Sequence, residues 1–183
     1  MGKIQIKNFD GVYEPAEASW LMAKHIPQFQ GSVLEIGCGS GIISIHLARR
    51  GNLVTAIDIN PKAVEATKFN SKENDLEIEV LEGDLFSSVK DRSFGTIVCN
   101  PPYLPPADEY DDIGLSLAVE GGPTGTEFTM KLLNEAENHL EATGFVYMIL
   151  SSRMKEFETS WNKEIIKQEK YFFERLNLVR FSR

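Results

Sequence analysis

Short apolar runs alternate along this chain with segments of helical periodicity, and no other feature of the sequence constrains the fold as much. The runs predict strands at 32–36, 53–57, 77–81, 94–98, 144–150 and 174–181. Helices are predicted at 14–26, with Pro15 in the first turn, and at 41–50, 61–72, 125–141 and 154–165. Strands joined through such helices form right-handed βαβ units, so we expect an α/β fold with a mostly parallel sheet and helices on both faces. The last strand is expected to pair with its predecessor as an antiparallel edge.

The composition is that of one ordinary domain with a single core. The chain has 183 residues, of which 42% are hydrophobic, and its net charge is −8. This acidic balance disfavours a nucleic-acid partner, because a phosphate backbone would be repelled. No stretch approaches the roughly 18 apolar residues of a membrane helix, and the first residues lack the apolar core of a signal peptide, so a cytoplasmic protein without membrane contact is expected. Cys38 and Cys99 have no partners at ligand spacing, which indicates buried thiols and no metal site.

Glycines follow the first predicted strand, where a parallel sheet places its ligand site. The stretch VLEIGCGSG has Gly37, Gly39 and Gly41 between an apolar run and a helix, with Glu35 just before them. Glycines at such a turn let the backbone approach a ligand closely. The spacing and the acidic Glu35 resemble motif I of class I S-adenosylmethionine (SAM) methyltransferases.

The next two strands end in carboxylates. Asp58 follows the glycines by about 20 residues, which suits an acceptor for ribose hydroxyl groups, although an acid there can also cap the next helix. Asn60 is the better candidate for that cap. After the third strand, Asp84 is placed to accept from an adenine amine, and the Leu85 N–H to meet a ring nitrogen, as in the same family.

The fourth strand ends in NPPY, residues 100–103. Two prolines stop a strand and fix a rigid loop, and an isolated Pro-Pro is often no more than that. Beside a nucleoside site, however, the Asn100 side-chain oxygen and the Pro101 carbonyl could accept the two N–H groups of a planar amide or amine. Tyr103 could stack on that group, and the clamp would orient its nitrogen toward a methyl donor.

The complete set of motifs resembles the HemK family of protein-glutamine N5-methyltransferases, in particular the short eukaryotic and archaeal form. Three stretches carry this resemblance beyond general SAM binding: GVYEPAEAS at 11–19, NPPY at 100–103 and EGGPTGTEF at 120–128. The resemblance implies the Rossmann-like, seven-stranded class I fold in one domain, 1–183, with residues 1–31 as a helical extension over the cofactor site. It also implies methylation of the glutamine of the Gly-Gly-Gln loop in a class 1 translation termination (release) factor.

The resemblance further assigns residues and a partner. SAM would be held by Ser19, Glu35, Gly37, Gly39, Gly41, Asp58, Asp84 and Leu85. The catalytic and substrate-binding residues would be Asn100, Pro101, Pro102 and Tyr103. Ala18 departs from the family, which usually has an acidic residue there. The short form usually works with a small zinc-binding activator protein, for which the edge strand at 76–83 is a docking candidate, although Glu77 and Glu79 could equally be charges that protect an edge.

Other interpretations of these motifs differ in the acceptor or in activity. An N6-adenine methyltransferase acting on RNA or DNA could use the same clamp on a flipped base, but no basic arm is visible. A non-catalytic subunit would have no reason to keep Gly37, Asp58, Asp84 and Asn100 together. The acidic stretch 107–114 could be a solvated loop or a rim that contacts a basic partner.

Overall fold

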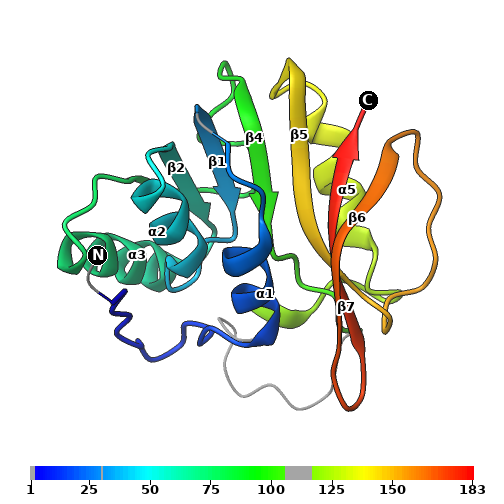
Figure 1. The fold of residues 1–183 in the computed structure, drawn as a ribbon, viewed down its shortest axis with the longest axis horizontal. Coiled ribbons are helices and arrows are strands. Elements are labelled where there is room, and N and C mark those ends of the chain that lie inside the picture. Colours follow the sequence, from blue (N-terminus) through cyan, green and yellow to red (C-terminus); the bar gives the residue numbers. More distant parts are fainter. Residues whose placement is uncertain (1–2, 30, 106–116) are drawn as a thin grey trace.

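A seven-stranded sheet with the order β3-β2-β1-β4-β5-β7-β6 organises the chain in the computed structural model, which describes residues 3–29, 31–105 and 117–183 (Figure 1). The strands are β1 (Ser32–Ile36), β2 (Leu53–Asp58), β3 (Glu79–Glu82), β4 (Phe94–Cys99), β5 (Leu140–Ser151), β6 (Asn162–Lys170) and β7 (Arg175–Ser182). The helices are α1 (Glu17–His25), α2 (Ile42–Arg49), α3 (Pro61–Glu73) and α5 (Glu127–Ala136).

The strand order reverses between β1 and β4, and this reversal locates the site. β3, β2, β1, β4 and β5 are mutually parallel, whereas β7 runs antiparallel to both β5 and β6. The chain leaves β1 toward β2 on one side and returns later to place β4 on the other side. A crevice therefore opens at the carboxyl ends of β1 and β4, where open α/β sheets bind their ligands.

The two faces of the sheet bury separate apolar clusters, as the period of two in a strand requires. Leu34 and Ile97 face a cluster completed by Leu132 of α5, while Val33 and Val98 face one completed by residues of α1 and α2. These five side chains are fully buried. The predicted α/β class, with helices on both faces of a mostly parallel sheet, is confirmed (Figure 1).

The prediction for the C-terminal part was wrong in one element. Residues 154–165, predicted as a helix, contain no helix, and β6 begins at Asn162. β7 does pair with β5 in antiparallel fashion, but β6 and not β7 forms the edge. The pattern of charged residues around Ile165 and Gln168 is compatible with a helix as well as with a strand. These residues form a strand because they pair with β7. Trp161 just before β6 is 8% exposed and joins the cluster under α5.

Two helix ends also differ from the predictions. Pro15 was expected in the first turn of a helix, but α1 begins at Glu17 and its N-cap is Ala16. α5 ends at Ala136, so His139 lies in the turn before β5, where its ring stacks on Phe86 with 4.5 Å between centroids. Asn60 is the N-cap of α3, as predicted, and its side chain accepts from the Lys62 N–H.

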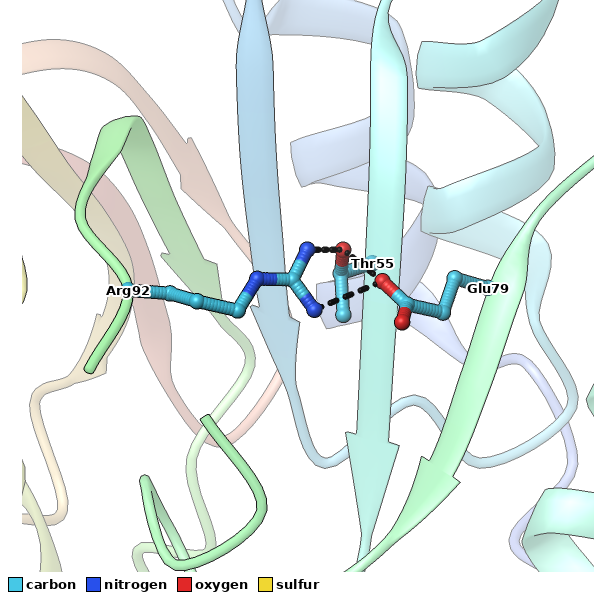
Figure 2. A network of polar contacts seen from close by, with 3 residues as sticks. All are labelled: Thr55, Glu79 and Arg92. Atoms are coloured by element: carbon cyan, nitrogen blue, oxygen red, sulfur yellow. Dashed lines mark hydrogen bonds and ion pairs between the residues drawn. The ribbon is translucent and has the colours of Figure 1, made fainter. Parts of the chain in front are cut away.

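A polar network fastens the edge strand β3 to its neighbour (Figure 2). Thr55 of β2 donates its hydroxyl to Glu79 at 2.8 Å, and Arg92 donates to both of them at 2.8 Å. Glu79 is thus both a charged residue on the edge strand and a hydrogen-bond acceptor that links this strand to Thr55 and Arg92. The Thr55 hydroxyl and the Arg92 guanidinium hold the pKa of Glu79 below its usual range.

Candidate active site

A cleft enclosing about 900 Å³, its open mouth included, lies at the carboxyl ends of β1, β2 and β4 and beside the loop after β3. The structure brings together in its wall nine of the residues predicted to form the site: Ser19, Glu35, Gly37, Gly39, Asp58, Asp84, Leu85, Asn100 and Pro102. Gly41, Pro101 and Tyr103 are not among the lining residues. Ser19 and Asn100, which are 81 residues apart in the sequence, thus meet where the strand order reverses.

Two of the glycines form an open cradle on the floor of the cleft. Gly37 and Gly39 have φ angles of 75° and 53°, which side chains rarely adopt, and a Cβ added at either would meet nothing within 4 Å. A side chain at either position would thus enter the space that a ligand needs. Gly41 instead caps α2, and an added Cβ there would lie 3.0 Å from the Thr67 side chain.

Asp58 ties the glycine turn to the start of α3. Its Oδ2 accepts from the Gly39 N–H at 2.9 Å and its Oδ1 from the Asn60 N–H at 2.9 Å. Burial raises the pKa of Asp58, although these backbone bonds oppose the rise. Since each carboxylate oxygen can accept more than one bond, Asp58 keeps acceptor capacity toward the cleft.

Glu35 is almost completely buried, with 1% of its surface exposed. Its carboxyl accepts from the Ser44 hydroxyl of α2. Burial raises the pKa of Glu35 to about 8, and the nearby Asp58 adds to the rise. At neutral pH the carboxyl group is therefore mostly protonated.

The turn after β3 places Asp84 and Leu85 on the opposite wall. Asp84 Oδ2 accepts from Lys131 Nζ of α5 at 3.0 Å, and both side chains are more than half exposed. A ligand amine would thus share Asp84 with a lysine. Leu85 has a left-handed φ of 46° and buries its side chain. That conformation costs on the order of 1 kcal/mol for a leucine, and such outliers are enriched where a backbone is held for a ligand.

Asn100 presents a buried acceptor that has no partner. Its Nδ2 donates to the Ser19 hydroxyl of α1 at 3.4 Å, whereas its Oδ1 is inaccessible to solvent and accepts no hydrogen bond from the described residues. An unpaired buried carbonyl oxygen costs about 1–3 kcal/mol. Because Asn100 lines the cleft, its side-chain oxygen is a candidate to accept a hydrogen bond from a ligand.

Tyr103 packs against the apolar cluster of α1 and α2. Burial raises the pKa of its phenol above the usual range, and Glu174 at the turn between β6 and β7 raises it further. Tyr103 is consequently a neutral group at physiological pH and has no role as a base here.

Several residues that line the cleft were not predicted as site residues from the sequence. Val12 and Tyr13 come from the segment before α1, Asn60 from the start of α3, and Phe128 from α5. Val12, Tyr13 and Phe128 lie inside the stretches 11–19 and 120–128, on which the family resemblance is based. Membership of these stretches was the only sequence signal that could have marked them as site residues. The stretch 107–114 lies outside the described residues.

These observations fit a bound SAM molecule. The open glycine cradle, the acceptor capacity of Asp58 and the apolar wall match the needs of a cationic nucleoside ligand. Within the described residues no group of three His, Cys, Asp or Glu side chains could hold a metal ion. Nor does any helix of that part of the chain have the length and apolar character needed to cross a membrane.

A family model described as "Methyltransferase small domain" matches residues 3–172 of the sequence. This match covers most of the chain. The chain belongs to the methyltransferase small domain family. As the motifs predicted, it is an enzyme that transfers a methyl group from SAM.

Curated relatives of this chain are named for two kinds of methyl acceptor, a glutamine of a protein and ribosomal RNA. A "putative protein N5-glutamine methyltransferase" from Methanocaldococcus jannaschii is 42% identical over 85% of this chain and 80% of its own length. A release factor glutamine methyltransferase from Rhodopirellula baltica is 32% identical over 81% of this chain and 57% of its own. A ribosomal RNA small subunit methyltransferase C from Aeromonas hydrophila is 31% identical over 79% of this chain and 39% of its own. The chain thus spans only about half, or less, of the two bacterial relatives.

A solved structure shares the fold. The Mtq2–Trm112 complex of E. cuniculi, described as responsible for methylation of the eRF1 translation termination factor, matches with a TM-score of 0.71 and 22% identity. The match covers 93% of this chain and 98% of that one. It supports the class I SAM methyltransferase fold that the motifs implied.

Proposed function

We propose that this protein methylates the side-chain amide of a glutamine in a protein, the glutamine of the Gly-Gly-Gln loop in a translation release factor. Asn100 carries the proposal, because it lines the cleft and its side-chain oxygen is an acceptor without a donor among the described residues. The 42% identity to a relative named for glutamine N5 methylation supports the same acceptor.

In this proposal Asn100 and Pro101 position the accepting nitrogen. Asn100 Oδ1 accepts one N–H of the glutamine amide and the Pro101 carbonyl accepts the other. Both acceptors are neutral, so they hold the amide without attracting the cationic cofactor into an ion pair. The rigid prolines fix the acceptors, and Pro102 and Tyr103 shape the wall against which the amide lies. The nitrogen forms its bond to the methyl group as the sulfur–methyl bond of SAM breaks, and it then releases one proton to water, since neither neutral acceptor is a base. The N–H that remains can still be held by either acceptor.

The opposite part of the cleft is proposed to hold SAM, which supplies an electrophilic methyl group when bound. Gly37 and Gly39 admit it, Asp58 accepts from its ribose, and Asp84 with the Leu85 N–H meets its adenine. Glu35, Ser19 and the capping glycine Gly41 shape the methionine end. Residues 1–31 are proposed to cover this site as part of one domain, 1–183.

A second candidate acceptor is the exocyclic amine of a nucleic-acid base. The relative named for ribosomal RNA methylation favours it, as does the planar nitrogen that such a base shares with an amide. The net charge of −8 opposes it, since RNA-binding proteins gain affinity from lysines and arginines that neutralise phosphates. The glutamine amide therefore remains the better proposal.

We further propose a small zinc-binding activator protein that pairs with β3. This strand is an edge of the sheet, and one side of its backbone has no strand beside it within the described residues. Glu79 does not obstruct such pairing, because its side chain is turned to Thr55 and Arg92 (Figure 2). A release factor as substrate would place the enzyme in the cytoplasm.

The acceptor is tested with methyl-labelled SAM and three substrates: a release factor, its Gly-Gly-Gln glutamine-to-alanine variant, and total ribosomal RNA. Each is incubated with and without a zinc-protein activator. Label on the unmodified factor alone is the expected result. Label on RNA would be compatible with the role of Asn100 and Pro101 but would contradict the glutamine as acceptor. Full activity of the chain without the zinc protein would contradict the need for an activator.

A further inference from the structure

Asparagines of α3 and of its C-terminal end hold the N-terminal segment through paired hydrogen bonds. Asn70 accepts from the Lys7 N–H at 2.9 Å and donates to the Lys7 carbonyl at 3.0 Å. Asn74, one turn further on, accepts from the Gln5 N–H at 3.1 Å and donates to the Gln5 carbonyl at 2.7 Å. Each amide side chain thus forms a donor–acceptor pair with the backbone of one residue, and the two residues alternate along the segment, as in the hydrogen bonding between neighbouring strands.

Asn70 also reaches the glycine turn. Its Nδ2 donates a second bond, at 2.9 Å, to the carbonyl of Ser40, which lies between Gly39 and Gly41. Asn70 is 0% exposed, and its bond to Ser40 is buried, whereas its two bonds to Lys7 are partly buried. A carboxamide has two N–H groups, and here one goes to the N-terminal segment and the other to the turn that forms the cofactor cradle.

The N-terminal segment continues from this contact into the cleft wall. Phe9 packs edge-on against Phe69 of α3, with 5.6 Å between ring centroids. The Gly11 carbonyl accepts from Asn60 Nδ2 at 2.9 Å, and Asn60 in turn donates its N–H to Asp58. Val12, the next residue, is 5% exposed and lines the cleft together with Tyr13.

We propose that Asn70 is a positioning residue for the cofactor, because it joins the N-terminal cover of the cleft to the glycine turn beneath it. The cover and the turn are separated in sequence by about thirty residues, and Asn70 is bonded to both. With Asn70 in place, the turn and the segment keep one relative position, and Val12 closes over a cradle of fixed shape. This inference rests on the SAM site of the proposed function and is independent of the acceptor.

Asn70→Ala tests the proposal, with Ser71→Ala as the matched control. Ser71 is the neighbouring buried residue, and its hydroxyl bonds to the Lys68 carbonyl within α3. Loss of the buried bond to Ser40 and of the two bonds to Lys7 predicts a Kd for SAM about ten-fold higher or more in Asn70→Ala, and within about two-fold in Ser71→Ala. The KM for SAM should rise in parallel, while kcat at saturating SAM stays close to that of the unmodified enzyme. A folded Asn70→Ala with unchanged affinity for SAM would overturn the proposal.

Hydrogen exchange of the unmodified protein supplies a test that needs no variant. SAM should slow exchange of the Lys7 amide, because a filled cradle stabilises the turn to which Asn70 joins it. The amide of Phe181 in β7, remote from the cleft lining, provides the internal reference. Equal exchange of the Lys7 amide with and without SAM would show that the segment is not coupled to the cofactor. Since the Kd for SAM and the exchange rates are measured without a methyl acceptor, a wrong substrate assignment would leave both of these results unaffected.

Discussion

The Ser19 hydroxyl lies 3.4 Å from Asn100 Nδ2, and this contact leaves Asn100 Oδ1 buried without a partner among the described residues. A carboxamide can rotate by half a turn about its last bond. In the structure Ser19 accepts from the nitrogen, so the oxygen is the end of the amide that has no partner among the described residues. A side chain of α1 thereby supports an acceptor at the end of β4.

Asn100→Ala should abolish methyl transfer and leave SAM binding intact. The alanine removes the oxygen that accepts from the amide, while the proposed cofactor contacts come from other residues. Calorimetry with SAM and a transfer assay measure the two effects separately. Normal turnover in this variant would exclude the clamp.

Ser19→Ala tests the orientation of that amide. Without the hydroxyl, the Asn100 amide loses this side-chain partner and is held less firmly, so we expect kcat to fall by about three- to ten-fold, the equivalent of one weak hydrogen bond. Ser19→Thr, which keeps a hydroxyl, should restore part of the rate. Equal rates for the alanine variant and the unmodified enzyme would show that Ser19 does not orient Asn100.

Asp58→Ala should weaken SAM binding by about ten- to a hundred-fold, because a charged acceptor contributes roughly 1.5–3 kcal/mol. Part of this loss comes from the Gly39 N–H, which Asp58 holds at 2.9 Å. Asp58→Asn keeps one acceptor oxygen, so its affinity for SAM should lie between those of Asp58→Ala and the unmodified protein. Unchanged affinity of Asp58→Ala, measured by calorimetry, would remove this residue from the cofactor site.

Glu35 should make the folded protein less stable as the pH rises. Its pKa is raised to about 8 in the folded state from 4.5. Between these values the unfolded chain has lost the proton and the folded chain has kept it, so the free energy of unfolding falls with pH. Below about 4.5 both states hold the proton, and the penalty is absent.

The size of this effect, on the order of several kcal/mol, is measurable in Glu35→Gln. Urea unfolding of the variant and the unmodified protein at about pH 5 and about pH 8.5, on either side of most of the titration, gives the comparison. The amide cannot titrate, so the variant should lose less stability between the two pH values. The raised pKa of Asp58 acts in the same direction in both proteins and cancels in the comparison. Identical slopes would mean that Glu35 titrates normally.

The sequence predicted the sheet and its site-bearing end well because both depend on local signals. The apolar runs at 32–36 and 94–98 are too short and too β-branched for buried helices, and the glycines and prolines mark where they end. β6 escaped prediction because its residues are mostly exposed and it is held by backbone pairing with β7. Such pairing leaves little hydrophobic pattern to read.

The site was predicted residue by residue only where a motif could be quoted. Asn70 belongs to no recognisable motif, and an asparagine inside a predicted helix is usually taken for a surface residue. Its burial follows from contacts with Lys7 and Ser40, which lie 63 and 30 residues away. Likewise, the burial that raises the pKa of Glu35 depends on α2 packing over β1, which no short segment encodes.

Tandem mass spectrometry of a release factor after incubation with SAM tests the central claim most directly. The unmodified enzyme should place one methyl group on the side-chain amide of the Gly-Gly-Gln glutamine, and Asn100→Ala should place none there while still binding SAM. A methyl group on another residue, or the same methylated glutamine from Asn100→Ala, would contradict the assignment of Asn100 as the residue that holds the accepting amide.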